Sequence, residues 1–206
     1  MGHPFPYNFF NTLNYMSHRL FVKPFRREAP METLLNLALQ AGFTRAAPLD
    51  AAHLEVRTEV RDMCAADRCH AYGRSWSCPP ACGTEEQCQA HINRYTRGIL
   101  LQTTGDMEDD FDADALFETE QRHKAAFSTL ARQIRSRYPN CLPLTAGACT
   151  LCRKCTYPKN PCRFPQKRFS SMEAYGLLVS DVCLKSGVKY YYGPKTITYT
   201  SCILID

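Results

Sequence analysis

The sequence predicts an α/β fold: a single domain in which helices cover a sheet and two cysteine-rich loops leave it. Three observations lead to this prediction. Helical and strand-like segments alternate along the chain, as they do in sheets covered by helices. The length of 206 residues suits one domain with a sizeable core. Most of the twelve cysteines gather in two segments without a regular hydrophobic period.

The first half of the chain contains two predicted helices and two predicted strands. Apolar residues share one face from Met31 onward in "METLLNLALQAGF", and Gly42 is a plausible stop for that helix. "TRAAPLD" (44–50) follows as a short strand. A second helix opens at "TEEQC", where Thr84 is the expected N-cap, and "GILLQTT" (98–104) has the composition of a buried strand.

An acidic run at 106–114 precedes the longest predicted helix. It lacks the alternating ligands and central glycine of a calcium loop, so it is interpreted as the solvated start of the helix. Phe127, Leu130 and Ile134 then share one side of that helix. "CLPLTAGA" (141–148) predicts a third strand.

The last part of the chain predicts further helix and then strand. "SSME" resembles a capping box, with Ser170 as N-cap and Glu173 reaching back, and one or two helices would run from there to Gly187. "KYYYG" and "TITYTSCILI" are rich in strand-forming residues and close the sheet.

Residues 1–30 differ from the rest, with Phe, Tyr, Asn and Pro but no period. They are interpreted as an N-terminal extension, either a disordered arm or translated sequence upstream of a natural start at Met31. The predicted cysteine-rich domain therefore spans residues 31–206.

The cysteine content indicates metal rather than disulfides. The N-terminus lacks the basic region and unbroken apolar run of a signal peptide, and no window reaches the eighteen apolar residues of a membrane span. We therefore expect a reducing, cytoplasmic location, where clustered cysteines more often bind metal. The net charge of +5 comes with no basic stripe, so neither nucleic acid nor membrane is an expected partner.

The strongest motif is the second cysteine segment, residues 149–162. Its spacing is Cys149-x2-Cys152-x2-Cys155-x6-Cys162. Three thiolates at every third residue let one loop wrap around a cube of iron and sulfide, as in ferredoxin-type [4Fe–4S] sites. Ferredoxins continue with x3-Cys-Pro, whereas here the interval is x6 and Arg163 follows. Zinc is the less favoured alternative, because it usually takes two separated CxxC pairs.

Cations surround this segment: Arg153, Lys154, Lys159, Arg163, Lys167 and Arg168. They are consistent with a solvated loop. They are equally consistent with stabilisation of the reduced, more negative state of a cluster.

The first cysteine segment, residues 64–88, has five cysteines where one cluster needs four: Cys64, Cys69, Cys78, Cys82 and Cys88. The first three are the best candidates, since they are expected on loop backbone that can curl around a metal. Either of the last two could complete the set. Cys88 is favoured because it begins a helix, where backbone donors and the helix dipole stabilise a thiolate, although a buried core cysteine is the simpler alternative.

Aromatic residues lie within the first cysteine segment. Tyr72 and Trp76 are candidates for a cover that keeps water away from a cluster. The isolated Cys141 and Cys183 are expected as buried small hydrophobes, whereas Cys202 is either core or a spare ligand. The histidines lack metal-ligand spacing.

The chain resembles the predicted metal-binding proteins that carry a domain of unknown function. The likeness runs from about Met31 to the C-terminus and is carried by "EVRDMCAADRCHAYGRSWSCPP", "GTEEQC", "GACTLCRKCTYPKNPCRFP", "SSMEAYG" and "TYTSCILI". The resemblance implies metal binding by Cys64, Cys69, Cys78 and Cys88 and by Cys149, Cys152, Cys155 and Cys162. It implies no reaction, and residues 1–30 lie outside it.

Three functions fit these observations. The leading hypothesis is a protein with two [4Fe–4S] clusters that transfers electrons to or from a redox partner protein, because no dinucleotide or phosphate-loop motif is present. The alternatives are an iron–sulfur enzyme with an open iron site and a structural module that holds zinc or clusters.

Overall fold

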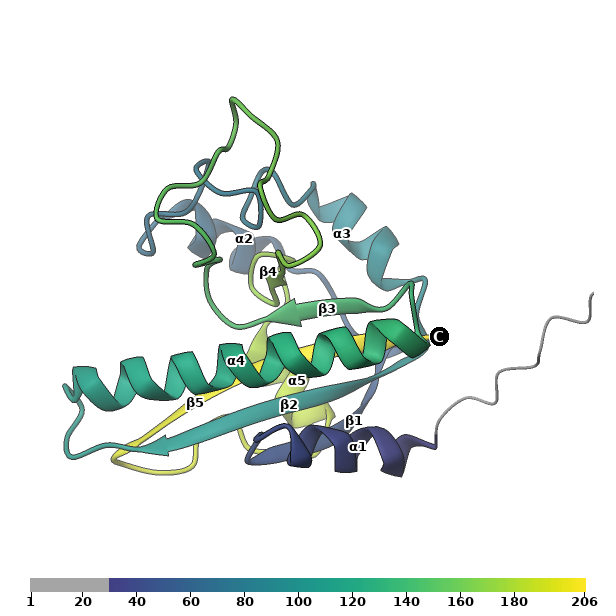
Figure 1. Ribbon diagram of the computed structural model, residues 1–206, viewed down its shortest axis with the longest axis vertical. Helices are drawn as coiled ribbons and strands as arrows, with labels where there is room; N and C mark the ends of the chain where they lie inside the picture. The colour runs from purple at the N-terminus through teal and green to yellow at the C-terminus, as the bar shows by residue number, and fades with distance from the viewer. Residues whose placement is uncertain (1–29) are drawn as a thin grey trace, which may run out of the picture.

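The computed structural model describes residues 30–206, which form one mixed α/β domain around a five-stranded sheet (Figure 1). The predicted fold class is therefore confirmed. The strands are β1 (Arg45–Asp50), β2 (Arg97–Asp106), β3 (Leu142–Thr145), β4 (Ser170–Ser171) and β5 (Thr196–Ile205). Their order is β1-β2-β5-β3-β4, antiparallel except for the parallel pair β3–β4. The extension predicted for residues 1–30 falls, apart from Pro30, outside this described part of the chain.

Five α-helices and one short 3₁₀ helix accompany the sheet. They are α1 (Met31–Gln40), η1 (Ala51–His53), α2 (Thr58–Ala65), α3 (Glu85–Ile92), α4 (Ala113–Arg137) and α5 (Val179–Lys185). The predicted starts of α1 and α3 are confirmed, and Thr84 caps α3 through a reciprocal capping box with Gln87. Helix α2 was not predicted. No helix within residues 30–206 has the length and apolar character needed to cross a membrane.

Both faces of the central strands are buried. Leu100 and Leu204 belong to one apolar cluster, to which α3 and α5 contribute. Their neighbours Ile99 and Ile203 belong to a second cluster that contains residues of α1 and α4. Successive side chains of a strand point to opposite faces, so the continuous apolar runs of β2 and β5 are explained by a helical layer on each side.

The predicted capping box at "SSME" is wrong. Ser170 and Ser171 form strand β4 beside β3, and a turn rather than a helix follows them. The Ser171 hydroxyl accepts a hydrogen bond from the backbone N–H of Ala174. The turn ends at Gly176, which has a φ of +82°. The "SSME" segment therefore forms a short strand and a tight turn. The next helix, α5, begins only at Val179.

Three isolated cysteines pack in or against the apolar core. Cys183 and Cys202 are fully buried in the cluster that contains α5, and the half-buried Cys141 packs against the other cluster. The expectation for Cys141 and Cys183 is consistent with this. Cys202 faces the same cluster as its strand neighbour Leu204, so its position is that of a core residue.

A buried histidine links α4 to the sheet. The His123 side chain has no exposure, its Nδ1 lies 2.9 Å from the Thr103 hydroxyl, and its ring lies edge-on to Phe43. Burial lowers the pKa of His123 to about 3. The imidazole therefore packs as a neutral ring.

This burial predicts a pH-dependent stability. An unfolded histidine titrates near pH 6.5, so between about pH 6.5 and pH 3 the unfolded chain binds more protons than the folded one. The free energy of unfolding should therefore fall as the pH falls through this window, by up to about 1.4 kcal/mol per pH unit from this group. Urea unfolding at several pH values should show a flatter dependence for His123→Asn than for the original chain. Parallel curves for the two proteins would contradict this assignment.

Candidate metal centres

The two cysteine segments lie together at one end of the molecule, next to the β3–β4 edge of the sheet (Figure 1). Helices α2 and α3 bound the first cysteine segment. The second cysteine segment lies on the long connection between β3 and β4, which contains turns and bends but no helix or strand. The two cysteine segments are some 80 residues apart in sequence, but they form one region of the molecule. Helices α2 and α3 position the first segment, and strands β3 and β4 position the second.

The four cysteines of the second cysteine segment line one cavity, called here the second cavity. They are Cys149, Cys152, Cys155 and Cys162. The free space between them is about 20 Å³. Turn backbone without ladder hydrogen bonds can widen at small cost, and it would have to do so to admit a four-iron cluster. The structure thus brings together the residues that the spacing singled out.

The first cysteine segment contributes to the wall of the second cavity. Ser75 and Trp76 line it, and the Trp76 Nε1 donates a hydrogen bond to the Asn160 carbonyl at 3.0 Å. The Trp76 carbonyl accepts a second hydrogen bond, at 3.0 Å, from Nη1 of Arg168. The Trp76 ring also packs edge-on against Tyr157, with 5.0 Å between ring centroids. Trp76 therefore covers cysteines of the other segment, which the sequence did not indicate.

Three cysteines of the first cysteine segment line a separate cavity of about 170 Å³, called here the first cavity. They are Cys64, Cys69 and Cys78, and Tyr72, Gly147, Ala148 and Glu173 lie in the same wall. Cys64 lies on helix α2 rather than on a loop, which corrects the expectation for it. Tyr72 lines the cavity, and its role as a cover for a cluster stays a prediction. Gly147 and Ala148 belong to the connection that carries the other cysteine segment.

The remaining two cysteines of the first segment form a pair beside Arg61. The Sγ atoms of Cys82 and Cys88 each lie 3.7 Å from Arg61 Nη1, and neither residue lines the first cavity. Cys88 is buried against the core, as its alternative interpretation expected. The closeness of the two thiols lowers the pKa of Cys88 and raises that of Cys82, with burial adding to the rise at Cys82.

Burial favours the neutral form of three thiols that line the two cavities. Burial raises the pKa of Cys64 to about 11, and it also raises the pKa values of Cys78 and Cys149. Burial acts in the same direction at Cys155, but backbone hydrogen bonds outweigh it, and the pKa of that thiol is lowered. Because thiolates are the ligand form, a bound cation would have to displace these protons.

Sequence reasoning missed two residues of this region. Arg61 donates short hydrogen bonds to the carbonyls of Ala174 at 2.6 Å and Gly83 at 2.7 Å. Glu173 lines the first cavity, and its Oε2 is buried without a hydrogen-bond partner among residues 30–206. A charged residue in a short helix and an acidic residue in a serine-rich turn give no local signal of such roles. Only the meeting of α2 with the β4 turn reveals them.

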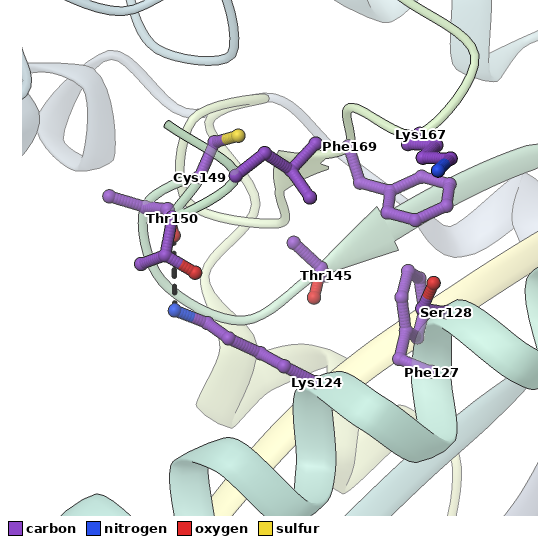
Figure 2. A pocket seen from close by; sticks show the side chains of 10 residues that line it. Lys124, Phe127, Ser128, Thr145, Cys149, Thr150, Lys167 and Phe169 are labelled. Atoms are coloured by element: carbon purple, nitrogen blue, oxygen red, sulfur yellow. Dashed lines mark hydrogen bonds between the residues drawn. The ribbon is translucent and has the colours of Figure 1, made fainter. Parts of the chain in front are cut away.

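A third cavity of about 80 Å³ lies between α4 and the second cysteine segment (Figure 2). Lys124 reaches from α4 to donate to the Ala148 carbonyl at 3.1 Å and pairs with Glu120 at 2.6 Å. Cys149 and Ala148 both line this cavity, and each also lines one of the cysteine cavities. The backbone leading into the second cysteine segment is therefore anchored by α4.

The donors are not arranged for a single ion. Within residues 30–206, no three His, Cys, Asp or Glu side chains gather closely enough to hold one metal ion. The three or four thiols of each cavity instead line a shared wall.

The fold and these two cavities define a class: a mixed α/β domain whose cysteines form two adjacent candidate metal centres. The family model described as "Predicted metal-binding protein (DUF2284)" matches residues 47–205. The chain belongs to this family. Comparison with curated proteins and with solved structures gives no match. The family thus supports metal binding. Which metal is bound, and what it is used for, are addressed by the proposal below.

We predict that Arg61 is needed to hold this region together. Arg61→Ala would leave the carbonyls of Gly83 and Ala174 without their charged donor. At about 1.5 kcal/mol or more for each such bond, the free energy of unfolding should fall by about 3 kcal/mol. Chemical denaturation measures this, with the exposed Arg68→Ala as control, expected to stay within about 0.5 kcal/mol of the original chain. Equal effects of the two substitutions would contradict the assigned role.

Proposed function

We propose that the protein binds two [4Fe–4S] clusters and transfers electrons to or from a partner protein in the cytoplasm. The second centre would be held by Cys149, Cys152, Cys155 and Cys162. The first would be held by Cys64, Cys69 and Cys78 with one further ligand, for which the sequence favours Cys88 over Cys82. Iron–sulfur clusters bound by thiolates supply reversible one-electron chemistry.

The observation that carries this proposal is the interlocking of the two cysteine segments. Trp76 of the first segment lines the second cavity, and Ala148, directly before Cys149, lines the first cavity. Two clusters held there would be neighbours. Electrons could then pass between them without a large movement of the chain, and a partner could draw on both from one face.

The surroundings of the second cavity suit an anionic cluster. Arg163 and Arg168 line it, and Lys167 lies beside it in the wall of the third cavity (Figure 2). Thiolate clusters are net anions, so these cations would favour the reduced state. Ser75 and Trp76 line the same cavity, and the Arg168 guanidinium lies over the Trp76 ring at 6.0 Å from its centroid.

The alternative of an iron–sulfur enzyme has one observation in its favour. The first cavity is lined by three cysteines, not four, and contains a carboxylate. A centre with three thiolates has a metal position that another ligand can occupy, as an enzyme needs. Structural zinc is supported less, because Cys149, Cys152 and Cys155 recur at every third residue and do not form two separated CxxC pairs.

The proposal predicts two separable metal centres. Anaerobically purified protein should contain iron and acid-labile sulfide in equal amounts, about eight of each per chain if both clusters are of the four-iron type. Cys152→Ala and Cys64→Ala should each remove about half of the iron, because each loses one ligand of a different centre. Cys141→Ala is the matched control, since Cys141 lines neither cavity. Zinc without sulfide, or full iron content in the Cys152→Ala protein, would overturn the proposal.

Electron transfer makes a further prediction that a structural role does not. Both clusters should take up and release one electron reversibly in a redox titration followed by electron paramagnetic resonance. Neighbouring reduced clusters should also broaden or split each other's signals. Cys64→Ala should leave a single, unsplit signal from the second centre. Clusters that do not cycle, or that show no mutual effect, would argue for a structural role instead.

A further inference from the structure

The first cavity is lined by one acidic side chain as well as by cysteines. Glu173 extends into it from the turn after β4, beside Cys64, Cys69 and Cys78. Its Oε2 is buried and has no hydrogen-bond partner within the described chain. A buried polar atom without a partner costs about 1–3 kcal/mol, and more if it is charged. In native structures most buried polar atoms have a partner from the protein, a water molecule or an ion.

The turn that carries this carboxylate is fixed by hydrogen bonds on both sides of Glu173. The Ser171 hydroxyl accepts a hydrogen bond from the Ala174 backbone N–H. The Glu173 carbonyl accepts a hydrogen bond from the Cys64 thiol at 3.6 Å, which ties the turn to helix α2. Contacts that fix the chain around a ligand are typical of metal sites.

The two competing ligands are engaged elsewhere. The Cys82 thiol donates to the Ala174 carbonyl at 3.3 Å, and the Cys88 thiol faces the Cys82 carbonyl at 3.8 Å. Both lie beside the Arg61 guanidinium, which compensates any charge on them. Neither lines the first cavity, whereas Glu173 does.

We propose that Glu173 is the fourth protein ligand of the first metal centre, which gives that centre three thiolates and one carboxylate. This rests on the proposed function, because it assumes a metal centre in the first cavity. The two centres would then differ. The second would have four thiolates, whereas the first would have one oxygen ligand, which is harder and binds iron less tightly than sulfur does. That position would be the one at which a small molecule entering the cavity could replace a protein ligand.

The test uses the full chain and follows retention of metal rather than activity. Loss of a ligand should make the metal of the first centre easier to remove. In Glu173→Gln, we expect a ferrous chelator to remove this fraction of the iron at least tenfold faster than from the original protein, by the scale of ligand-shell substitutions. Cys82→Ala and Cys88→Ala should release iron at the original rate, and so should Glu86→Gln, an exposed carboxylate of α3 that serves as control.

A cysteine at position 173 gives a second, independent readout. Glu173→Cys replaces oxygen by sulfur, so the first centre should retain its iron while its paramagnetic resonance spectrum changes to that of a four-thiolate site. This variant also decides the matter if Glu173→Gln fails to fold, as judged by circular dichroism. Retention with a changed spectrum supports ligation. A spectrum and release rate identical to those of the original protein overturn it.

The outcomes separate this inference from the proposed function. If Glu173→Gln releases iron at the original rate and Cys88→Ala or Cys82→Ala releases it faster, a cysteine is the fourth ligand and only this inference fails. If Cys64→Ala leaves the iron content unchanged, the first cavity holds no centre. That result overturns both the inference and the two-cluster proposal.

Discussion

The contacts of one guanidinium hold the first cysteine segment against the sheet. Arg61 lies on α2, three residues before Cys64, and bonds to the carbonyl of Gly83 before α3 and to that of Ala174 after β4. These three pieces of chain share no regular hydrogen-bond ladder. Because the guanidinium has several donors in a rigid fork, one side chain can fix all three. The position of Glu173, next to Ala174, depends on the same contact.

The surroundings of the two cavities disfavour charged ligands in the chain by itself. Thiols with raised pKa values and a buried carboxylate oxygen without a partner are gathered where burial disfavours charge. A metal group would supply the missing charge and would gain from every deprotonated ligand. Its binding energy would then become part of the folding energy of this region, as in other small metal domains.

The rest of the domain supplies rigidity at a distance from the cavities. Strands β2 and β5 pair over ten residues and are covered by helices on both faces. Helix α4 runs along one face and anchors the start of the second cysteine segment through Lys124. The turns of the second cysteine segment are thus attached to the sheet at both ends, by β3 and by β4. A rigid scaffold of this kind is typical of proteins whose binding residues lie on loops, because it keeps the loops at a constant position relative to each other.

Local sequence determined most of the fold and the grouping of one set of candidate ligands. Periodic apolar residues and caps indicated α1, α3, α4 and the central strands, because these signals depend on near neighbours. The close spacing of Cys149, Cys152 and Cys155 likewise restricted them to one site.

Other features depend on contacts between distant parts of the chain, and only the tertiary structure revealed them. Trp76 covers the cysteines of the other segment, and "SSME" forms a turn rather than the start of a helix. It also set apart Cys82 and Cys88 beside Arg61 and placed Glu173 with three cysteines. Such placements depend on the docking of α2 against the turn after β4, and no spacing within either segment encodes that contact.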